Sequence, residues 1–169
     1  LYEHYYGKQI EVIANSKTGV ASAGIMAFFQ SLHLDHLERL QSIFSSMDLT
    51  ESQFVSDIRQ FHTLELVNLC HDKAARISDQ SFSNYLIKYV FVDKKIIPLN
   101  QMIKDGFFIN KEKTISACNT LLNVFSDRTV QDYVEEQVKI VWDCLRPDTD
   151  NFFSFFKAFY MVRPTDTLV

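Results

Sequence analysis

The sequence predicts an all-α fold, an irregular stack of about seven to nine antiparallel helices of the helical-bundle or α–α repeat kind. Apolar residues recur at spacings of three and four along most of the chain, which is the period of an amphipathic helix. Fifteen Phe and seven Tyr stand against four Gly and three Pro, a composition that disfavours disorder and a turn-rich β fold. No internal repeat has a stable consensus, so a regular solenoid is not predicted.

The length and composition predict one domain. A chain of 169 residues that is 47% hydrophobic can bury a core of its own. We therefore expect a single all-helical domain over residues 1–169. Because the chain begins at Leu1 and not at a methionine, we expect this domain to be excised from a longer protein.

The first helix is predicted over residues 2–13, with Tyr6, Ile10 and Ile13 on one side. Residues 15–24 are small and polar and contain two glycines, which is typical of a loop. A helix or a pair of helices should follow over residues 25–47.

The middle of the chain carries two helix starts. Thr50 and Gln53 fit a capping box, in which the hydroxyl and the glutamine side chain satisfy the first free amides of a helix. Helical spacing then continues over residues 63–77. Asp79 can cap the next helix, and residues 89–92 form a β-like run that is too short to change the helical prediction. The apolar positions behind the capping box are Phe54, Ile58 and Phe61.

Two shorter helices are predicted next. Residues 99–104 should form a helix that Gly106 closes in the left-handed conformation. Asn110 should cap a helix whose apolar residues recur at spacings of three, four and three. These residues are Ile115, Cys118, Leu122 and Phe125.

The last third of the chain contains the clearest helix pattern of the sequence. From Val130 the apolar residues are spaced four, four, three and four apart, which places them on one side of a long helix. Ile140, Trp142 and Cys144 widen this surface, so the helix should be covered on more than one side. Pro147 should end it. The residues of the apolar stripe are Val130, Val134, Val138, Val141 and Leu145.

A final helix is predicted over residues 151–162, and Asp148, Thr149 or Asp150 can cap it. Phe152, Phe155, Phe156 and Phe159 share one face, and Phe153 and Tyr160 lie on the other. Burying so many rings in a core or covering them with a partner would each keep them from water. The candidate partner-binding residues are Phe152, Phe153, Phe156 and Tyr160.

A local basic stretch provides a second candidate surface. Between residues 88 and 113, six lysines stand against three acids, although the whole chain carries a net charge of −4. With Phe107 and Phe108 among them, the lysines could contact an RNA backbone or an acidic partner. An ordinary solvated surface is the favoured explanation of the same residues. The candidate nucleic-acid contacts are Lys94, Lys95, Lys111 and Lys113.

No pattern of reactive side chains predicts an enzyme, a metal site or a cofactor. His33 and His36 could share a helix face, but no third ligand follows at a recognisable spacing. Cys70 and His71 are adjacent, so on a helix they would diverge by about 100° and could not act as nucleophile and base. Asp148 and Asp150 lack the glycine and the closing glutamate of a calcium loop.

The cysteines and the hydropathy indicate the compartment. Cys70, Cys118 and Cys144 are widely spaced, odd in number and set in apolar patterns, which suggests buried thiols in a reducing compartment. The chain contains no 18-residue apolar run and no signal peptide. We therefore expect an intracellular protein of the nucleus or the cytoplasm.

Two segments are similar to one known family. Residues 138–145 form an apolar helix, and after a short break residues 151–157 read Asn-Phe-Phe-Ser-Phe-Phe-Lys. This pattern resembles the SAC3/GANP family. Residues 81–87 resemble its Glu-Phe-x-x-Tyr helix, with Ser81 in place of the acid. The resemblance covers about a third of the chain, and it implies a non-catalytic helical scaffold of a nuclear mRNA-export assembly.

Three functions stay open at this point. The first is a non-catalytic interaction scaffold that binds protein partners through a groove between helices. The second is a nucleic-acid-binding module that uses the basic stretch over residues 88–113. The third is a carrier in which the phenylalanines line a cavity for a hydrophobic ligand.

Overall fold

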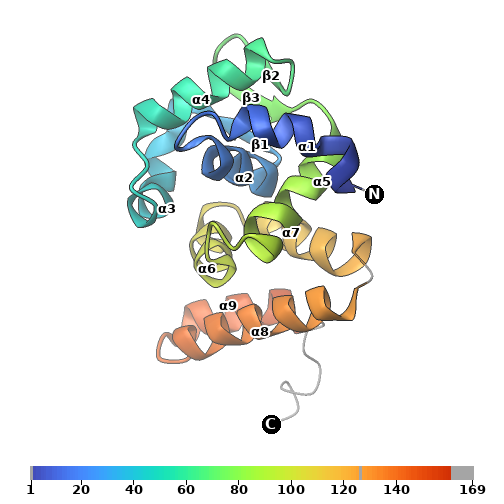
Figure 1. Cartoon of the computed structure of the whole chain (residues 1–169). Coiled ribbons are helices and arrows are strands. Elements are labelled where there is room, and N and C mark those ends of the chain that lie inside the picture. Colours follow the sequence, from blue (N-terminus) through green and yellow to red (C-terminus); the bar gives the residue numbers. More distant parts are fainter. Residues whose placement is uncertain (1, 126, 161–169) are drawn as a thin grey trace. The chain divides into compact units, whose positions relative to one another are not determined.

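The computed structural model describes residues 2–125 and 127–160 (Figure 1). These residues are mainly helical, with nine α-helices and one small three-stranded sheet, which confirms the predicted all-α class. The chain divides into two compact units, Leu1–Ile97 (unit 1) and Pro98–Val169 (unit 2). That the whole chain acts as a single domain stays a prediction.

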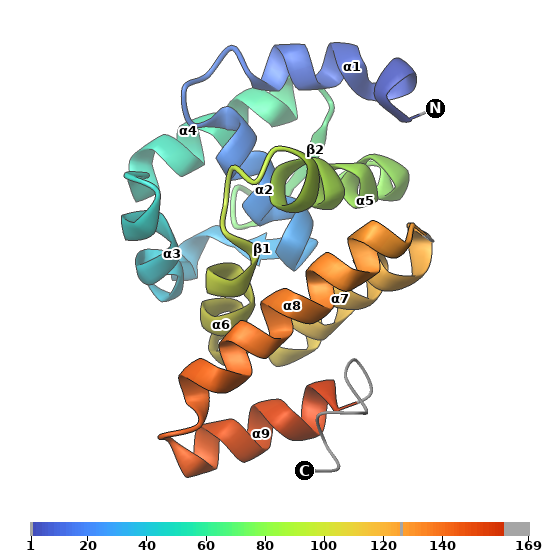
Figure 2. The same cartoon turned by 60° about the horizontal axis from the view of Figure 1, so that its bottom comes forward.

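Unit 1 is built around helix α2. All residues of α2 from Ser22 to Phe29 are buried, and Figure 2 shows α2 enclosed by α1, α4 and α5. The elements of unit 1 are α1 (Tyr2–Ile13), α2 (Gly19–Phe29), β1 (Ser31–His33), the 3-10 helix η1 (Leu34–Leu40), α3 (Gln41–Ser46), α4 (Glu51–Thr63), β2 (Val67–Cys70), β3 (Ala74–Ile77), α5 (Gln80–Lys88) and the π-helix η2 (Tyr89–Asp93).

The loop predicted over residues 15–24 is wrong in its second half, because α2 already begins at Gly19. The small residues there serve close packing and not a turn. A Cβ atom on Gly24 would lie 2.6 Å from Cγ1 of Val90, on η2. Gly24 therefore lets α2 and η2 approach more closely than any side chain would allow.

The helix predicted over residues 25–47 is interrupted. It ends after Phe29, because Gln30 adopts a positive φ of 62°. The chain then enters β1, η1 and α3. Leu37 and Leu40 of η1 and Phe44 of α3 are buried.

The helix predicted over residues 63–77 is wrong: these residues form the antiparallel hairpin β2–β3, and β1 joins it in the order β1-β3-β2. Exposure alternates along β2, from buried Val67 to exposed Asn68, which is the period of a strand. The hairpin turns at His71 and Asp72, whose φ values are 51° and 54°. Glycine or asparagine usually occupies such positions, so the sequence carried no turn signal.

The two helix caps predicted in unit 1 are confirmed. Thr50 and Gln53 form the capping box of α4. The Asp79 carboxylate accepts hydrogen bonds from the amides of Ser81 and Phe82 at the start of α5. The β-like run over residues 89–92 continues α5 as the π-helix η2.

The described part of unit 2 consists of four helices, in which α6 packs against α7 and α8, and α8 packs against α7 and α9. Helix α6 continues through Gly106, so the predicted glycine cap is wrong; α6 ends at Ile109, before Asn110 caps α7 as predicted. The helices described in this unit are α6 (Leu99–Ile109), α7 (Lys111–Val124), α8 (Arg128–Leu145) and α9 (Thr149–Phe159).

Helix α8 carries the core of unit 2. Its predicted apolar stripe from Val130 to Leu145 is buried along its whole length, and Trp142 is buried beside it. Ile140 and Cys144 are exposed, so the predicted covering of α8 on further sides is wrong for these two residues. Both lie on the flank of the stripe opposite to Trp142.

Candidate partner-binding surface

Helix α9 begins at Thr149, two residues before the start predicted at residue 151. Among the three candidate caps, Asp148 accepts the hydrogen bond from the amide of Asn151, at 3.3 Å. The helix is described to Phe159, and the predicted end at Val162 lies outside the described residues. Phe155 and Phe159 are buried against Phe107 of α6, with ring centroids 5.0 and 6.0 Å apart. These two rings pack α9 against the rest of unit 2.

The four predicted partner-binding residues lie together on the adjoining side of α9. We call them the α9 aromatic surface: Phe152, Phe153, Phe156 and Tyr160. At 100° per residue they occupy one sector of about 100° around the helix axis, next to the buried rings. Phe153 is 60% exposed and Tyr160 48% exposed. The core of this chain therefore leaves these two rings uncovered, and covering by a partner stays a prediction.

The rings of this surface are continuous with the core. Phe156 packs on buried Trp142 of α8 with ring centroids 5.6 Å apart, and Figure 2 shows α9 running beside α8. Phe152 contacts both Phe156 and Phe153 at 5.8 Å. Exposure thus rises step by step from Trp142, through the half-buried Phe152 and Phe156, to Phe153. Because these ring contacts already restrict the side chains of the cluster, the cluster loses little further conformational entropy when it binds a partner.

The predicted nucleic-acid contacts fall in both units. Lys94 and Lys95 follow η2 in unit 1, and Lys111 and Lys113 begin α7 in unit 2. The Lys94 ammonium lies 5.7 Å from the centre of the Tyr89 ring, and that of Lys111 lies 5.4 Å from the Phe107 ring. These cation–π contacts position two of the four charges.

Cys70 and His71 depart from the sequence prediction. Since they lie at a hairpin turn and not on a helix, their side chains meet: Cys70 Sγ is 3.3 Å from His71 Nδ1, and both are exposed. The prediction that these two side chains point too far apart to act as nucleophile and base is therefore wrong. The nearby His62 has a different hydrogen-bond partner, since its Nδ1 lies 2.9 Å from the carbonyl oxygen of Val67.

Only one of the three cysteines is buried as predicted. Burial raises the pKa of the Cys118 thiol to about 12, because the thiolate would lose its hydration. Cys70 and Cys144 are exposed free thiols.

The remaining predicted polar residues form no site within residues 2–125 and 127–160. His33 ends β1 and His36 lies on η1 with non-helical dihedral angles, so they do not share a helix face. His36 lies 3.7 Å from Glu38. Among the described side chains, no three His, Cys, Asp or Glu residues gather as a metal site would require.

Sequence reasoning missed a cluster around Asp57. This buried carboxylate of α4 accepts hydrogen bonds from the hydroxyls of Ser16, Thr18 and Ser22, at 2.6, 2.6 and 2.7 Å. It thereby ties α4 to the α1–α2 connection and to the first turns of α2. An acid at an inward position of the apolar pattern, between Phe54 and Ile58, was the available signal.

Two further findings bear on the open functions. An apolar cavity in unit 1, lined by Met26, Phe61 and Leu86 among others, has a volume of about 10 Å³, which is the space of a single water molecule.

Within the described residues, none of the helices has the length and apolar character to cross a bilayer.

The class of protein that fold and surface define is a helical protein with an exposed aromatic surface. No protein-family model, curated protein or solved structure gives a significant match to this chain.

Proposed function

We propose that this protein is a non-catalytic helical scaffold that binds a protein partner through the α9 aromatic surface, as part of a multi-protein assembly. One observation carries the proposal: Phe153 and Tyr160 are largely exposed on one side of α9, and the Phe153 ring packs against the half-buried Phe152 ring. Exposed aromatic side chains in a contiguous patch are typical of protein interfaces, where they supply much of the binding energy.

The spacing of the rings favours a helical partner. Phe152, Phe156 and Tyr160 follow one another at intervals of four residues, so they form a ridge about 12 Å long on α9. Ridges of this kind fit the grooves between the side-chain rows of a second helix. An amphipathic helix of the partner, with its apolar side laid along this ridge, would cover the rings.

The cellular setting is proposed from the sequence. The SAC3/GANP resemblance of residues 138–157 and 81–87 favours a nuclear mRNA-export assembly, in an intracellular, reducing compartment of the nucleus or cytoplasm. Free thiols at Cys70 and Cys144 agree with such a compartment.

The experiment replaces Phe153 with a photo-crosslinking phenylalanine analogue and identifies the proteins captured in cells. Tyr5, which is 77% exposed in unit 1, carries the same analogue as the matched control. Crosslinks specific to position 153 are expected. The captured partner is then purified, and its affinity is measured for the wild type and for a Phe153→Ser/Tyr160→Ser variant.

The double substitution should weaken binding at least about tenfold, because two exposed aromatic contacts are lost. Its thermal unfolding should match that of the wild type, since both side chains are largely exposed. A Tyr5→Ser variant should bind normally. Identical crosslinks at positions 5 and 153, or an unchanged affinity of the double variant, would contradict the proposal.

A second candidate is an RNA-binding module that uses Lys94, Lys95, Lys111 and Lys113. The observation that favours it is that the exposed Lys94 ammonium lies over the ring of half-buried Tyr89, because charge and ring together suit a nucleic-acid strand. The cavity in unit 1 gives no support to the third candidate, a carrier of hydrophobic ligands, because its volume of about 10 Å³ is too small for a fatty chain.

A further inference from the structure

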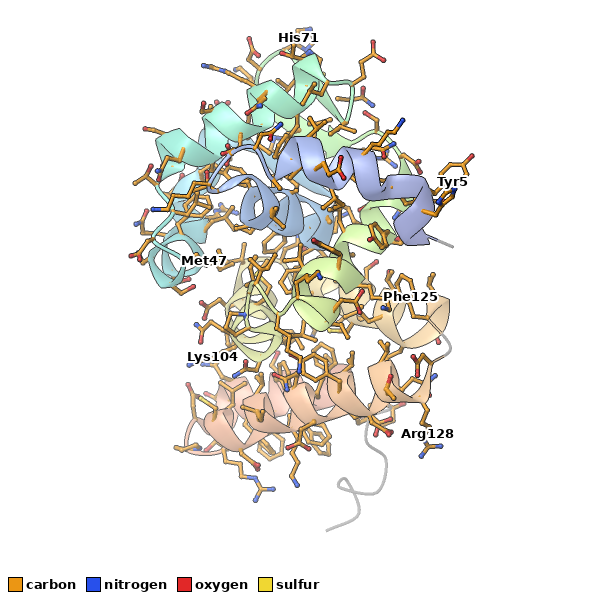
Figure 3. The ribbon with its side chains drawn as sticks, in the orientation of Figure 1. Tyr5, Met47, His71, Lys104, Phe125 and Arg128 are labelled. Carbon is orange, nitrogen blue, oxygen red and sulfur yellow. The ribbon has the colours of Figure 1, made fainter. Side chains whose placement is uncertain are left out.

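The tip of the β2–β3 hairpin brings a nucleophile and a base together. Cys70 Sγ and His71 Nδ1 lie 3.3 Å apart, within the range of a hydrogen bond to sulfur. Both side chains are exposed. Figure 3 shows His71 on the surface of unit 1, where a small molecule in solution can reach it.

The local backbone holds this pair in place and leaves the sulfur uncovered. The turn that follows Cys70 is closed by a hydrogen bond of 3.0 Å from the Lys73 amide to the Cys70 carbonyl oxygen. Cys70 ends β2 on the exposed side of the sheet, since exposure alternates along the strand. Its cross-strand neighbour is Ala74, whose methyl group is too short to cover Sγ.

Each of the other two cysteines lacks a property of Cys70, either the exposure or the hydrogen-bond partner. Cys118 is buried, 1% exposed, inside unit 2. Cys144 is exposed on α8, but no described residue forms a hydrogen bond with its sulfur. The chain therefore offers an accessible thiol with an imidazole, an accessible thiol without one and an inaccessible thiol.

We propose that Cys70 is a site of covalent modification by thiol–disulfide exchange with small-molecule disulfides, and that His71 assists the exchange. His71 Nδ1 accepts the thiol proton, and the Cys70 sulfur attacks one sulfur of the disulfide. The disulfide bond breaks, and the leaving thiolate takes the proton back from the imidazolium. The products are a mixed disulfide on Cys70 and one free small thiol, so the disulfide is the only oxidant required.

The test measures the rate of mixed-disulfide formation with oxidised glutathione, by intact mass, on the full chain. A Cys144→Ser variant reports on Cys70, and a Cys70→Ser variant reports on Cys144. Cys70 should react at least about tenfold faster than Cys144, because its thiol has a base in contact. Cys118 should stay unmodified in both variants.

Added in the Cys144→Ser background, His71→Gln should bring the rate at Cys70 down to that of Cys144. His4→Gln, an exposed histidine of α1, should leave the rate unchanged and serves as the matched control. Circular dichroism should show the same helix content in every variant. Equal rates at Cys70 and Cys144, or a fast Cys70 that survives His71→Gln, would overturn the proposal.

Discussion

Cys118 and Cys70 show how far the surroundings decide the chemistry of one kind of side chain. Both lie at positions where the sequence predicted a buried thiol. The helix pattern of α7 turns Cys118 into the core, where its pKa is raised to about 12 by lost hydration. The hairpin exposes Cys70 beside an imidazole. Residue type alone therefore did not distinguish an inert thiol from an accessible one.

The raised pKa of Cys118 predicts a loss of stability in alkali. Below pH 9 the thiol is protonated in the folded and the unfolded chain alike. Between pH 9 and about 12 the unfolded chain gives up this proton and the folded chain keeps it, so the free energy of unfolding falls by roughly 1 kcal/mol per pH unit. Urea unfolding of the wild type and of Cys118→Ala, at pH 8 and pH 10, measures the difference.

The variant should be less stable at pH 8 because it has a cavity, yet it should lose less stability on going to pH 10. Burial also raises the pKa of the Tyr133 hydroxyl, but Tyr133 is present in both proteins and its effect cancels. Parallel pH dependences of wild type and variant would show that Cys118 does not cause the loss.

Asp57 supports a prediction on stability. Asp57→Ala would leave three hydroxyls, one of them on fully buried Ser22, without their acceptor. We expect the free energy of unfolding to fall by about 2–4 kcal/mol, measured by urea denaturation. Asp132→Ala is the control, since Asp132 is exposed and its ion pair with Arg128 contributes little. Equal effects of the two substitutions would contradict the assigned role of Asp57.

At the scale of elements, two glycines in helices allow a matched comparison. Gly24 of α2 lies against Val90, whose branched side chain cannot move aside, so Gly24→Ala should destabilise the protein by about 1–3 kcal/mol. Gly7 of α1 has no atom within 4 Å of the position of an added Cβ. Gly7→Ala should therefore stabilise by about 0.5–1 kcal/mol. Thermal unfolding measures both, and shifts of the same sign would count against the packing argument.

Helix α9 shows that one element can serve a core and a surface at once. Phe155 and Phe159 are directed into unit 2, while Phe153 and Tyr160 face solvent a quarter to a half turn away. The sequence predicted the helix and the grouping of its rings. It could not tell which rings α6 and α8 would cover, because that depends on where Phe107 and Trp142 lie.

At the scale of the whole molecule, charge provides the test of the RNA-binding alternative. The chain has a net charge of −4, so any affinity for RNA has to come from a local basic surface. Lys94→Glu/Lys95→Glu should then weaken RNA binding in 50 mM salt about tenfold or more. Lys8→Glu/Lys17→Glu, which changes the net charge equally in α1 and the loop after it, should have little effect.

Fluorescence anisotropy with a single-stranded RNA oligonucleotide measures these affinities. A wild type that does not bind in low salt would remove this alternative. An equal loss in both double variants would show that net charge, and not the surface around Lys94, governs binding.

Much of the fold could be predicted from the sequence. Helix periodicity and caps are local, and they correctly predicted the stripe of α8, the capping box of α4 and the caps Asp79 and Asn110. For α9 they narrowed the cap to three residues, one of which is Asp148. The wrong predictions concern segments whose local pattern fits two different structures. Small residues at 19–24 permit a turn or a close helix crossing, and residues 67–77 fit a helix or a hairpin.

The sequence by itself determined that most of this chain is helical and which residues of α9 group together, because both follow from the 3.6-residue period of the backbone. Only the tertiary structure decided which of those rings stay exposed, that Asp57 meets three hydroxyls, and that Cys70 touches His71. Exposure and contact depend on neighbouring elements, and long-range packing selects one arrangement among several that the local pattern allows.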